Sequence, residues 1–322
     1  MARRNNQLNQ REMKVIQSEV IHDSFNFDEL FMLFLQDGNL RNLRPHTLTY
    51  YSNELMSFRK ALETLELDTT PAKIKPDHLN QFIIYSKDVL ELKIVSINTR
   101  LRAIRAFFNF AYKHGYIPKN PFANIQLLKD RRTVIETFTR EQIHKLLKSA
   151  DLRTFTGVRD YTIMLLLLET GVRASELIGI ETDDIRWEDS MILIRNTKGH
   201  RERLVPFQSK MRAQLKKYLS IRGKCETDAL LVTMDNTALS KRQLQNRISY
   251  YGEKSKIKNV RCSCHTFRHT FAKMAVKQGA GIFELQQILG HTSMEMVRIY
   301  VNLYSDDVKE KHKEFSPLKY LL

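Results

Sequence analysis

Apolar side chains recur every three or four residues in several stretches of the first third of the chain, which is the spacing of one face of a helix. Residues 27–35 carry one such stripe, a second begins at Pro45, a third begins near Pro76, and a fourth ends at Gly115. Proline is favoured in the first turn of a helix and glycine directly after the last turn. The pattern therefore predicts four helices, and with them a helical domain over residues 25–115.

The rest of the chain combines helical patterns with one pair of short strands. Two capping boxes, residues 139–142 and 240–243, each predict the start of a helix. Between them, residues 191–194 and 203–207 have strand-like sequences and are joined across a turn that contains Gly199. The predicted fold class is mainly α with a small antiparallel β insert.

The composition is that of an ordinary folded protein, with 42% apolar and 27% charged residues among 322, which argues against a disordered or collagen-like chain. The charge is unusual, because 52 lysines and arginines face 36 aspartates and glutamates and leave a net charge of +16. Such an excess favours a polyanionic partner, either nucleic acid or an anionic membrane surface.

The sequence contains no segment suited to a membrane or to secretion. Its longest apolar runs, residues 30–35 and 163–168, are six residues each, whereas a helix needs about 20 to cross a bilayer. The amino terminus is basic but lacks the apolar stretch of a secretory signal. Three cysteines favour a reducing compartment, so we expect a cytoplasmic protein without a membrane partner.

Side chains suited to phosphate chemistry occur in the second part of the chain. Arg173 follows a nearly all-apolar helix and emerges beside the core, where a guanidinium needs an anion. His265 and Arg268 are three residues apart, so a helix would place them on one face. We expect the opposite face to be buried through Phe267, Phe271 and Met274. Two further candidates follow near the carboxyl end, His291 and Tyr300.

These side chains together fit the cleavage of a phosphodiester. Arg173 and Arg268 could bind the phosphate oxygens and offset the negative charge that grows in the transition state. Tyr300 would be the nucleophile, and because a phenol has a pKa of about 10, a base such as His265 must accept its proton. Lys198, in the turn between the two predicted strands, could protonate the leaving 5′ oxygen.

The chain resembles the tyrosine recombinases, the family of phage integrases, Xer-type resolvases and transposon integrases. It carries their motifs in order and spacing, as Thr-Gly-Val-Arg173-Ala-Ser-Glu176, His265-Thr-Phe-Arg268-His-Thr-Phe-Ala, Leu-Gly-His291 and Tyr300. Each motif alone is weak, but all of them in this order behind a basic helical domain are specific. The resemblance covers roughly residues 25–305.

The resemblance implies an enzyme that clamps double-stranded DNA between its two domains and cuts one strand at a time through a 3′-phosphotyrosyl link. It implies no metal, no ATP and no other cofactor. Four protomers would act as a homo-tetramer on two DNA sites and pass through a Holliday junction, with accessory DNA-bending proteins as further candidate partners. The implied catalytic residues are Arg173, Lys198, His265, Arg268, His291 and Tyr300, with Glu176 supporting the first arginine.

The resemblance also suggests how the chain divides. We expect a basic tail (1–24), a helical core-binding domain (25–120), a linker (121–138), a mixed α/β catalytic domain (139–305) and a carboxyl-terminal helix and tail (306–322). The first 24 residues are too few for a separate arm-binding domain, so simple DNA sites without arms are expected. In the family such tails dock on a neighbouring subunit, which we carry over as a hypothesis.

Basic and polar residues near predicted helix starts are candidates for contacts with DNA, because helix starts attract phosphates. In the first domain these are Arg44, His46, Thr47, Arg100 and Arg102. In the second domain they are Lys241, Arg242 and Gln245, together with Arg247 on the same outward side of the helix. The same residues could equally form an ordinary solvated face.

Several candidates also allow a plainer interpretation. Arg173 could form a structural ion pair with Glu169 or Glu176, and a single histidine is more often a surface or core residue than a catalytic one. Tyr304, one helical turn beyond Tyr300, competes for the role of nucleophile.

Two alternatives concern the chemistry as a whole. A metal site could be built from Cys262, Cys264, His265 and His269. Their spacing is poor for a zinc finger, and Thr266 stands where a zinc protease has its glutamate. A type IB topoisomerase would use similar arginine, lysine and tyrosine chemistry, whereas a non-catalytic DNA-binding regulator would leave these side chains without a purpose.

Overall fold

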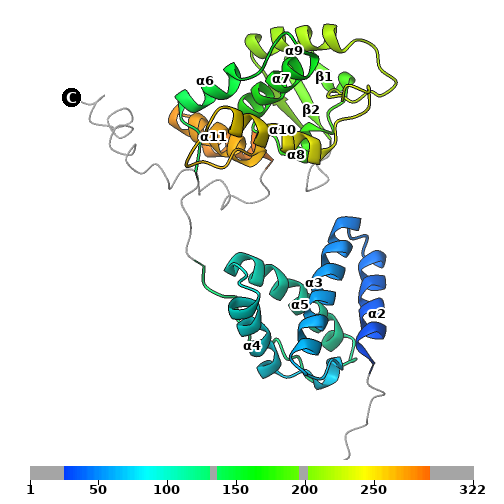
Figure 1. Ribbon diagram of the computed structural model, residues 1–322. Coiled ribbons are helices and arrows are strands. Elements are labelled where there is room, and N and C mark those ends of the chain that lie inside the picture. Colours follow the sequence, from blue (N-terminus) through cyan, green and yellow to red (C-terminus); the bar gives the residue numbers. More distant parts are fainter. Residues whose placement is uncertain (1–24, 131–135, 196–201, 291–322) are drawn as a thin grey trace, which may run out of the picture. The chain divides into compact units, whose positions relative to one another are not determined.

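The computed structural model describes residues 25–130, 136–195 and 202–290. Contacts within the chain divide it into two compact units, Met1–Thr133 and Val134–Leu322 (Figure 1). In the described part of the chain, no helix is both long and apolar enough to cross a membrane.

The first unit contains the four predicted helices. They are α2 (Phe27–Leu40), α3 (Pro45–Thr64), α4 (Pro76–Ile84) and α5 (Ile94–Lys113), with a 3₁₀ turn at Pro71–Lys73 and a π turn at Tyr85–Val89. Helix α5 packs against α2 and α3, and α4 packs against α3 (Figure 1).

Local sequence explains where these helices begin and what they bury. Helix α2 starts with a capping box in which the Asn26 and Glu29 side chains bind each other's backbone N–H groups, a signal that the sequence analysis did not use. Helix α3 has Pro45 in its first turn, as predicted. The apolar stripes meet in one core, where Phe58 lies edge-on to Phe82.

The second unit is mainly helical. It contains α6 (Arg140–Lys148), α7 (Phe155–Thr170), α8 (Ala174–Leu177), α9 (Ser209–Arg222), α10 (Lys241–Lys254), α11 (Cys264–Lys277) and α12 (Ile282–Leu289), with a 3₁₀ turn at Thr182–Asp184. Both predicted capping boxes form. Thr139 Oγ1 accepts from the Gln142 N–H at 3.2 Å, and Ser240 Oγ accepts from the Gln243 N–H at 3.2 Å.

A small antiparallel sheet has the strand order β1-β2-β3, with β1 at Ile185–Arg186, β2 at Met191–Ile194 and β3 at Arg203–Pro206. The predicted pairing of β2 with β3 is confirmed, and Ile194 lies opposite Arg203 at the end of the hairpin where the two strands are connected. The turn that was expected to join them lies outside the described residues. Strand β1 was not predicted because two residues are too short to show a periodicity.

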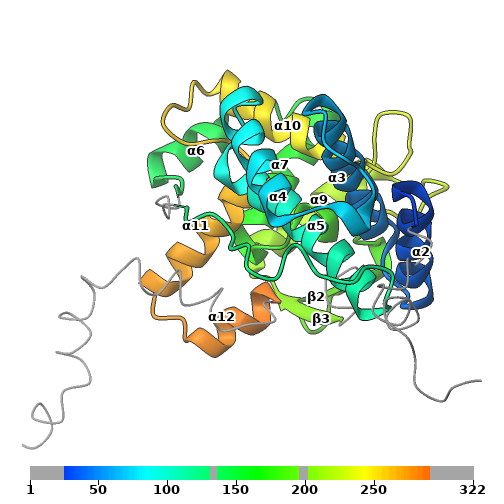
Figure 2. The same ribbon diagram turned by 90° about the horizontal axis from the view of Figure 1, so that it is seen from below.

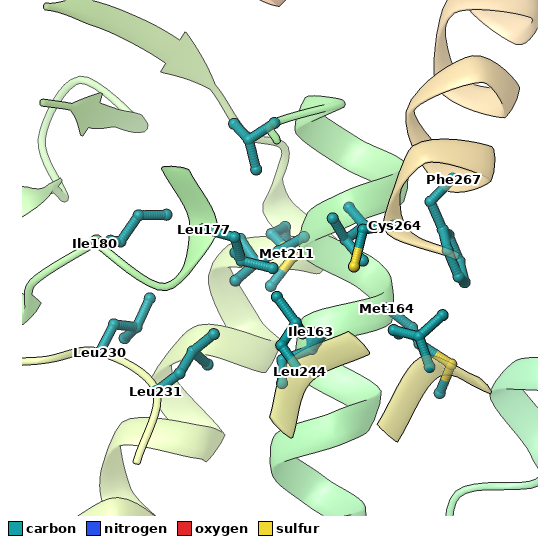
Figure 3. Close-up of a cluster of buried hydrophobic side chains, with 14 of the residues drawn as sticks. Ile163, Met164, Leu177, Ile180, Met211, Leu230, Leu231, Leu244, Cys264 and Phe267 are labelled. Carbon is teal, nitrogen blue, oxygen red and sulfur yellow. The ribbon is translucent and has the colours of Figure 1, made fainter. Parts of the chain in front are cut away.

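Helix α7 is the centre of the second unit. Side chains of α7, α8, α10 and α11 meet in one buried hydrophobic core, among them Ile163, Leu177, Leu244 and Cys264 (Figure 3). Helix α12 ends beside β3 (Figure 2). The core therefore holds the ends of α7, α11 and α12 in fixed places.

One expectation about α11 is wrong. Phe267 is fully buried and Phe271 is partly buried, but Met274 is 37% exposed. The last turns of α11 contribute Ala272 and Val276, not Met274, to a small core that they share with α12. That contact turns Met274 toward solvent.

Candidate functional site

Arg173 is held at the turn between two helices. Helix α7 ends at Thr170, Gly171 adopts a left-handed conformation with φ of 59°, and Arg173 is the N-cap of α8. The Arg173 guanidinium donates to Glu176 Oε1 at 2.8 Å, and the Arg173 backbone N–H donates to Glu176 Oε2 at 2.9 Å. The arginine thus forms the ion pair with Glu176, yet 27% of its side chain remains exposed.

Glu176 is the buried anchor of this turn. Its side chain is fully covered and also accepts two hydrogen bonds from Arg203, at 3.1 and 2.8 Å. Burial would raise the pKa of the Glu176 carboxyl, but the hydrogen bonds and charge of Arg203 and the hydrogen bonds from Arg173 outweigh it and lower the pKa to about 2. The carboxylate is therefore ionised at neutral pH.

Arg268 reaches the same place from α11. Its residue is only 2% exposed, and its guanidinium donates to the carbonyls of Gly171 at 2.7 Å and Leu289 at 2.8 Å. Arg173 also donates to the Leu289 carbonyl, at 3.4 Å. Two guanidinium groups therefore converge on one carbonyl at the carboxyl end of α12, where the helix dipole is negative.

His265 lies in the first turn of α11, where the charges of Arg173 and Arg268 influence its pKa. Partial burial lowers the pKa of His265, and the charges of Arg268 and Arg173 lower it further. Its ring lies edge-on to that of His269, with centroids 4.2 Å apart. Burial, His265 and Arg268 lower the pKa of His269 to about 4. At neutral pH His265 is therefore a neutral imidazole that can accept a proton.

The structure thus brings together Arg173, Glu176, His265 and Arg268. The remaining candidates, Lys198, His291 and Tyr300 with its competitor Tyr304, lie outside the described residues. Gly290 directly precedes His291 in the sequence. Its carbonyl accepts a hydrogen bond from the Arg173 guanidinium at 3.4 Å.

The structure adds one residue that the sequence analysis missed, Arg203. It donates to Glu176 and to the carbonyl of Ile288 at 2.8 Å, and so belongs to the same cluster. A signal was present in the sequence. Side chains alternate along a strand, so Arg203 lies on the same face as Val205, the buried residue of β3. A buried guanidinium needs acceptors for its hydrogen bonds, and a carboxylate is the acceptor that also balances its charge.

The two cysteines of the alternative metal site are packing residues. Cys264 is buried in the core around α7, and Cys262 packs against Gly252 of α10. Burial raises the pKa of each thiol to about 11, which disfavours the thiolate that binds a metal. Among the residues that the structure describes, no three His, Cys, Asp or Glu side chains gather as a metal site requires.

Comparison with known proteins identifies the chain. The phage integrase family matches residues 136–306, and the SAM-like N-terminal domain of phage integrases matches residues 31–115. The chain belongs to the phage integrase family of tyrosine recombinases. It is a site-specific DNA recombinase, and the topoisomerase and regulator alternatives are not favoured.

Individual relatives agree with this family. The chain is 30% identical over 282 residues to "Tyrosine recombinase XerC" of Thermodesulfovibrio yellowstonii, a match that covers 85% of this chain and 91% of the relative. A lambda integrase dimer bound to a COC′ core site shares the fold with a TM-score of 0.73 at 18% identity, covering 92% and 81% of the two chains. The Tn1549 transposon integrase in complex with transposon right end DNA has a TM-score of 0.72 at 20% identity, and the match covers 89% of this chain and 99% of that chain.

Helix α10 presents the predicted polar face of this recombinase. Lys241, Arg242 and Gln245 are all exposed on its first turns. Arg247 was expected beside them, but its guanidinium binds the buried Asp160 of α7 at 2.6 Å. That expectation is wrong because a buried carboxylate on the neighbouring helix draws Arg247 inward.

The candidates in the first unit differ in exposure. His46 and Arg102 are exposed, Thr47 is partly exposed in the first turn of α3, and Arg44 is the residue before that helix. Arg100 is largely covered, and its Nε lies 3.2 Å from Glu54 Oε2. Arg102 therefore offers the more accessible charge on α5.

Proposed function

We propose that this recombinase cuts one strand of double-stranded DNA with Tyr300 as the nucleophile. Arg173 and Arg268 bind the scissile phosphate, and His265 accepts the phenolic proton. Lys198 protonates the leaving 5′ oxygen, and His291 completes the phosphate site. Glu176 holds Arg173 in position.

The proposed step conserves atoms and charge. The phenolic oxygen of Tyr300 bonds to the phosphorus, the bond from phosphorus to the 5′ oxygen breaks, and a 3′-phosphotyrosyl link and a free 5′-hydroxyl result. Attack by a 5′-hydroxyl of a second strand reverses the step and releases the tyrosine. The bond energy is retained in the ester, so the proposal requires neither ATP nor a metal. It includes four protomers on two DNA sites.

The observation that carries the proposal is the convergence of Arg173 and Arg268 on the Leu289 carbonyl. The cluster contains three guanidinium groups, those of Arg173, Arg203 and Arg268, and one carboxylate, so it is cationic. A cationic site with a partly exposed arginine suits a phosphate whose negative charge grows during the reaction. His265 is neutral beside it and can act as the base.

The proposed DNA contacts follow the basic surface. The net charge of +16 favours a duplex as the partner, and Lys241, Arg242 and Gln245 form an exposed set on α10. The first unit would act as the core-binding domain and bind the same duplex through residues near the start of α3 and along α5. We place the reaction in the cytoplasm, in keeping with three free cysteines.

The test is a covalent trap. The protein is incubated with duplexes selected for binding from a random library and nicked a few nucleotides from the cut, so that the short released strand diffuses away. We expect a protein–DNA adduct that survives denaturation. Arg173→Ala should abolish the adduct and keep most DNA affinity, whereas Arg153→Ala, which removes an exposed arginine that pairs with Asp151, should keep both. EDTA should change nothing.

No adduct from the wild-type chain on any selected duplex would refute the proposed function. Normal adduct formation by Arg173→Ala would remove this residue from the site, and inhibition by EDTA would support the metal alternative.

A further inference from the structure

All three guanidinium nitrogens of Arg203 donate hydrogen bonds within the second unit. Its Nη1 and Nη2 donate to the two oxygens of Glu176 at 3.1 and 2.8 Å, and its Nε donates to the Ile288 carbonyl at 2.8 Å. The side chain is 9% exposed. A planar fork that binds a carboxylate through two parallel bonds fixes both position and angle.

The carboxylate that Arg203 binds is the one that holds Arg173. Glu176 accepts from the Arg173 backbone N–H at 2.9 Å and from the Arg173 guanidinium at 2.8 Å. The two arginines therefore share one buried carboxylate. A shift of the Glu176 carboxylate displaces the guanidinium of Arg173 with it.

The other contacts of Arg203 reach the end of α12. Gly290 has a left-handed φ of 63°, and a Cβ atom added there would lie 2.9 Å from Arg203 Nη1. The guanidinium therefore lies against the Gly290 backbone, and Gly290 is the residue before His291. Arg203 is also paired with Ile194, at the end of the β2–β3 pair where the connecting segment that includes Lys198 begins and ends.

We infer that Arg203 is a positioning residue for strand cleavage, because its guanidinium connects the β2–β3 hairpin to the Glu176–Arg173 pair and to the end of α12. This inference rests on the proposed function, since each of the three segments leads to a proposed catalytic residue. Lysine keeps the charge of Arg203, but its three N–H donors lie on one nitrogen and cannot reproduce the planar fork that reaches two carboxylate oxygens and the Ile288 carbonyl.

Arg195 provides a matched control on the same hairpin. It directly follows β2, and its Nε lies 2.6 Å from a fully buried carboxylate, that of Asp184. Asp184 is bound to the Glu181 backbone N–H at 3.0 Å and not to the arginine cluster. Arg195→Lys therefore weakens an ion pair on the same hairpin without changing the contacts to the Glu176–Arg173 pair or to the end of α12.

The experiment measures cleavage and binding separately on the selected nicked duplex. Single-turnover adduct formation at saturating protein gives the cleavage rate, and a titration at equilibrium gives the affinity. We expect Arg203→Lys to cleave roughly 10- to 100-fold more slowly than wild type, as small misplacements of catalytic groups do, with affinity within about threefold. Arg195→Lys should cleave within about threefold of wild type. An equal loss in both variants, or a loss in Arg203→Lys explained by affinity alone, would overturn the inference.

A second measurement keeps the inference testable if Arg203→Lys is unstable. Trp187, the single tryptophan, packs on the core of the second unit, so its emission shows at which temperature each variant is folded and can be assayed. The cleavage rates of Glu176→Gln, Arg203→Lys and the double variant then form a cycle. If Arg203 acts through Glu176, the double variant is no slower than the slower single variant. If the rate loss of the double variant equals the product of the two single losses, Arg203 does not act through Glu176, and the inference is contradicted.

The two proposals fail in different ways. An absent adduct with wild-type protein would refute the proposed function and the inference together. Cleavage by Arg203→Lys at the wild-type rate would refute the inference and leave the proposed function intact.

Discussion

Replacing Glu176 by glutamine tests whether the arginine cluster depends on one buried carboxylate. The Glu176 carboxylate accepts four hydrogen bonds, two from Arg173 and two from Arg203. Glu176→Gln removes the charge with little change in shape and leaves two guanidinium groups without their counter-ion. We therefore expect the second unit to lose stability without a large cavity.

The size of the effect follows from the pKa. The pKa of Glu176 is lowered from its ordinary 4.5 to about 2, which corresponds to about 3 kcal/mol of stability at neutral pH. Loss of one partner of a buried ion pair typically costs about 3 to 5 kcal/mol, in agreement. Because the pKa is lower in the folded state, this contribution is complete above pH 4.5 and is lost as pH falls toward 2.

Urea unfolding followed through Trp187 emission measures the second unit specifically. At pH 7 we expect Glu176→Gln to unfold with about 3 kcal/mol less free energy than wild type, and this difference should fall by about half between pH 5 and pH 3. Glu253→Gln, at an exposed position of α10, is the control and should match wild type. A difference below about 1 kcal/mol at pH 7, or one that does not change with pH, would refute the reasoning.

Four further predictions concern other parts of the second unit. Because the pKa of His265 is lowered, the single-turnover cleavage rate should decline as pH falls with a midpoint below the ordinary histidine pKa of about 6.5; a midpoint at or above 6.5 would contradict its role as the base. Gly171→Ala should lower unfolding free energy by at least about 2 kcal/mol, because its Cβ would lie 2.5 Å from a phenylalanine ring. Gly279→Ala, directly after α11, also has a positive φ, of 90°, but no described atom lies within 4 Å of its Cβ, so it should cost only about 1 kcal/mol; equal costs would contradict the packing argument. In urea unfolding, Arg247→Ala should destabilise by about 2 kcal/mol, because the buried Asp160 loses one of its two arginine partners and keeps the ion pair with Arg159. Arg242→Ala should leave stability unchanged and reduce the slope of log affinity against log salt by about 1; an unchanged slope would remove Arg242 from the DNA contacts.

Much of the fold could be predicted because its signals are local. Helix α3 follows an apolar stripe that includes Leu55, Phe58 and Leu62, all of them fully buried. Both capping boxes also form, since a cap depends on four consecutive residues. Strand β1 and the inward turn of Arg247 depend on partners far away in the sequence, and such partners leave no periodic signal.

The candidate site shows the same limit. Arg173, His265 and Arg268 could be found from short motifs, and the structure places them together. The motifs do not reveal that Arg268 is almost completely buried or that Arg203 shares Glu176 with Arg173. Both facts come from contacts between segments separated by 20 or more residues, which only the folded chain brings together.

The most direct test of the whole account is to locate the bond between protein and DNA. The trapped adduct is digested with nuclease and trypsin, and the nucleotide-bearing peptide is sequenced by fragmentation in a mass spectrometer. Cleavage after Arg298 and Lys309 yields one peptide that contains both Tyr300 and Tyr304, so fragment ions must distinguish them. The account predicts the nucleotide on Tyr300 and no adduct from Tyr300→Phe. A nucleotide on Tyr304 or on any other side chain would contradict it.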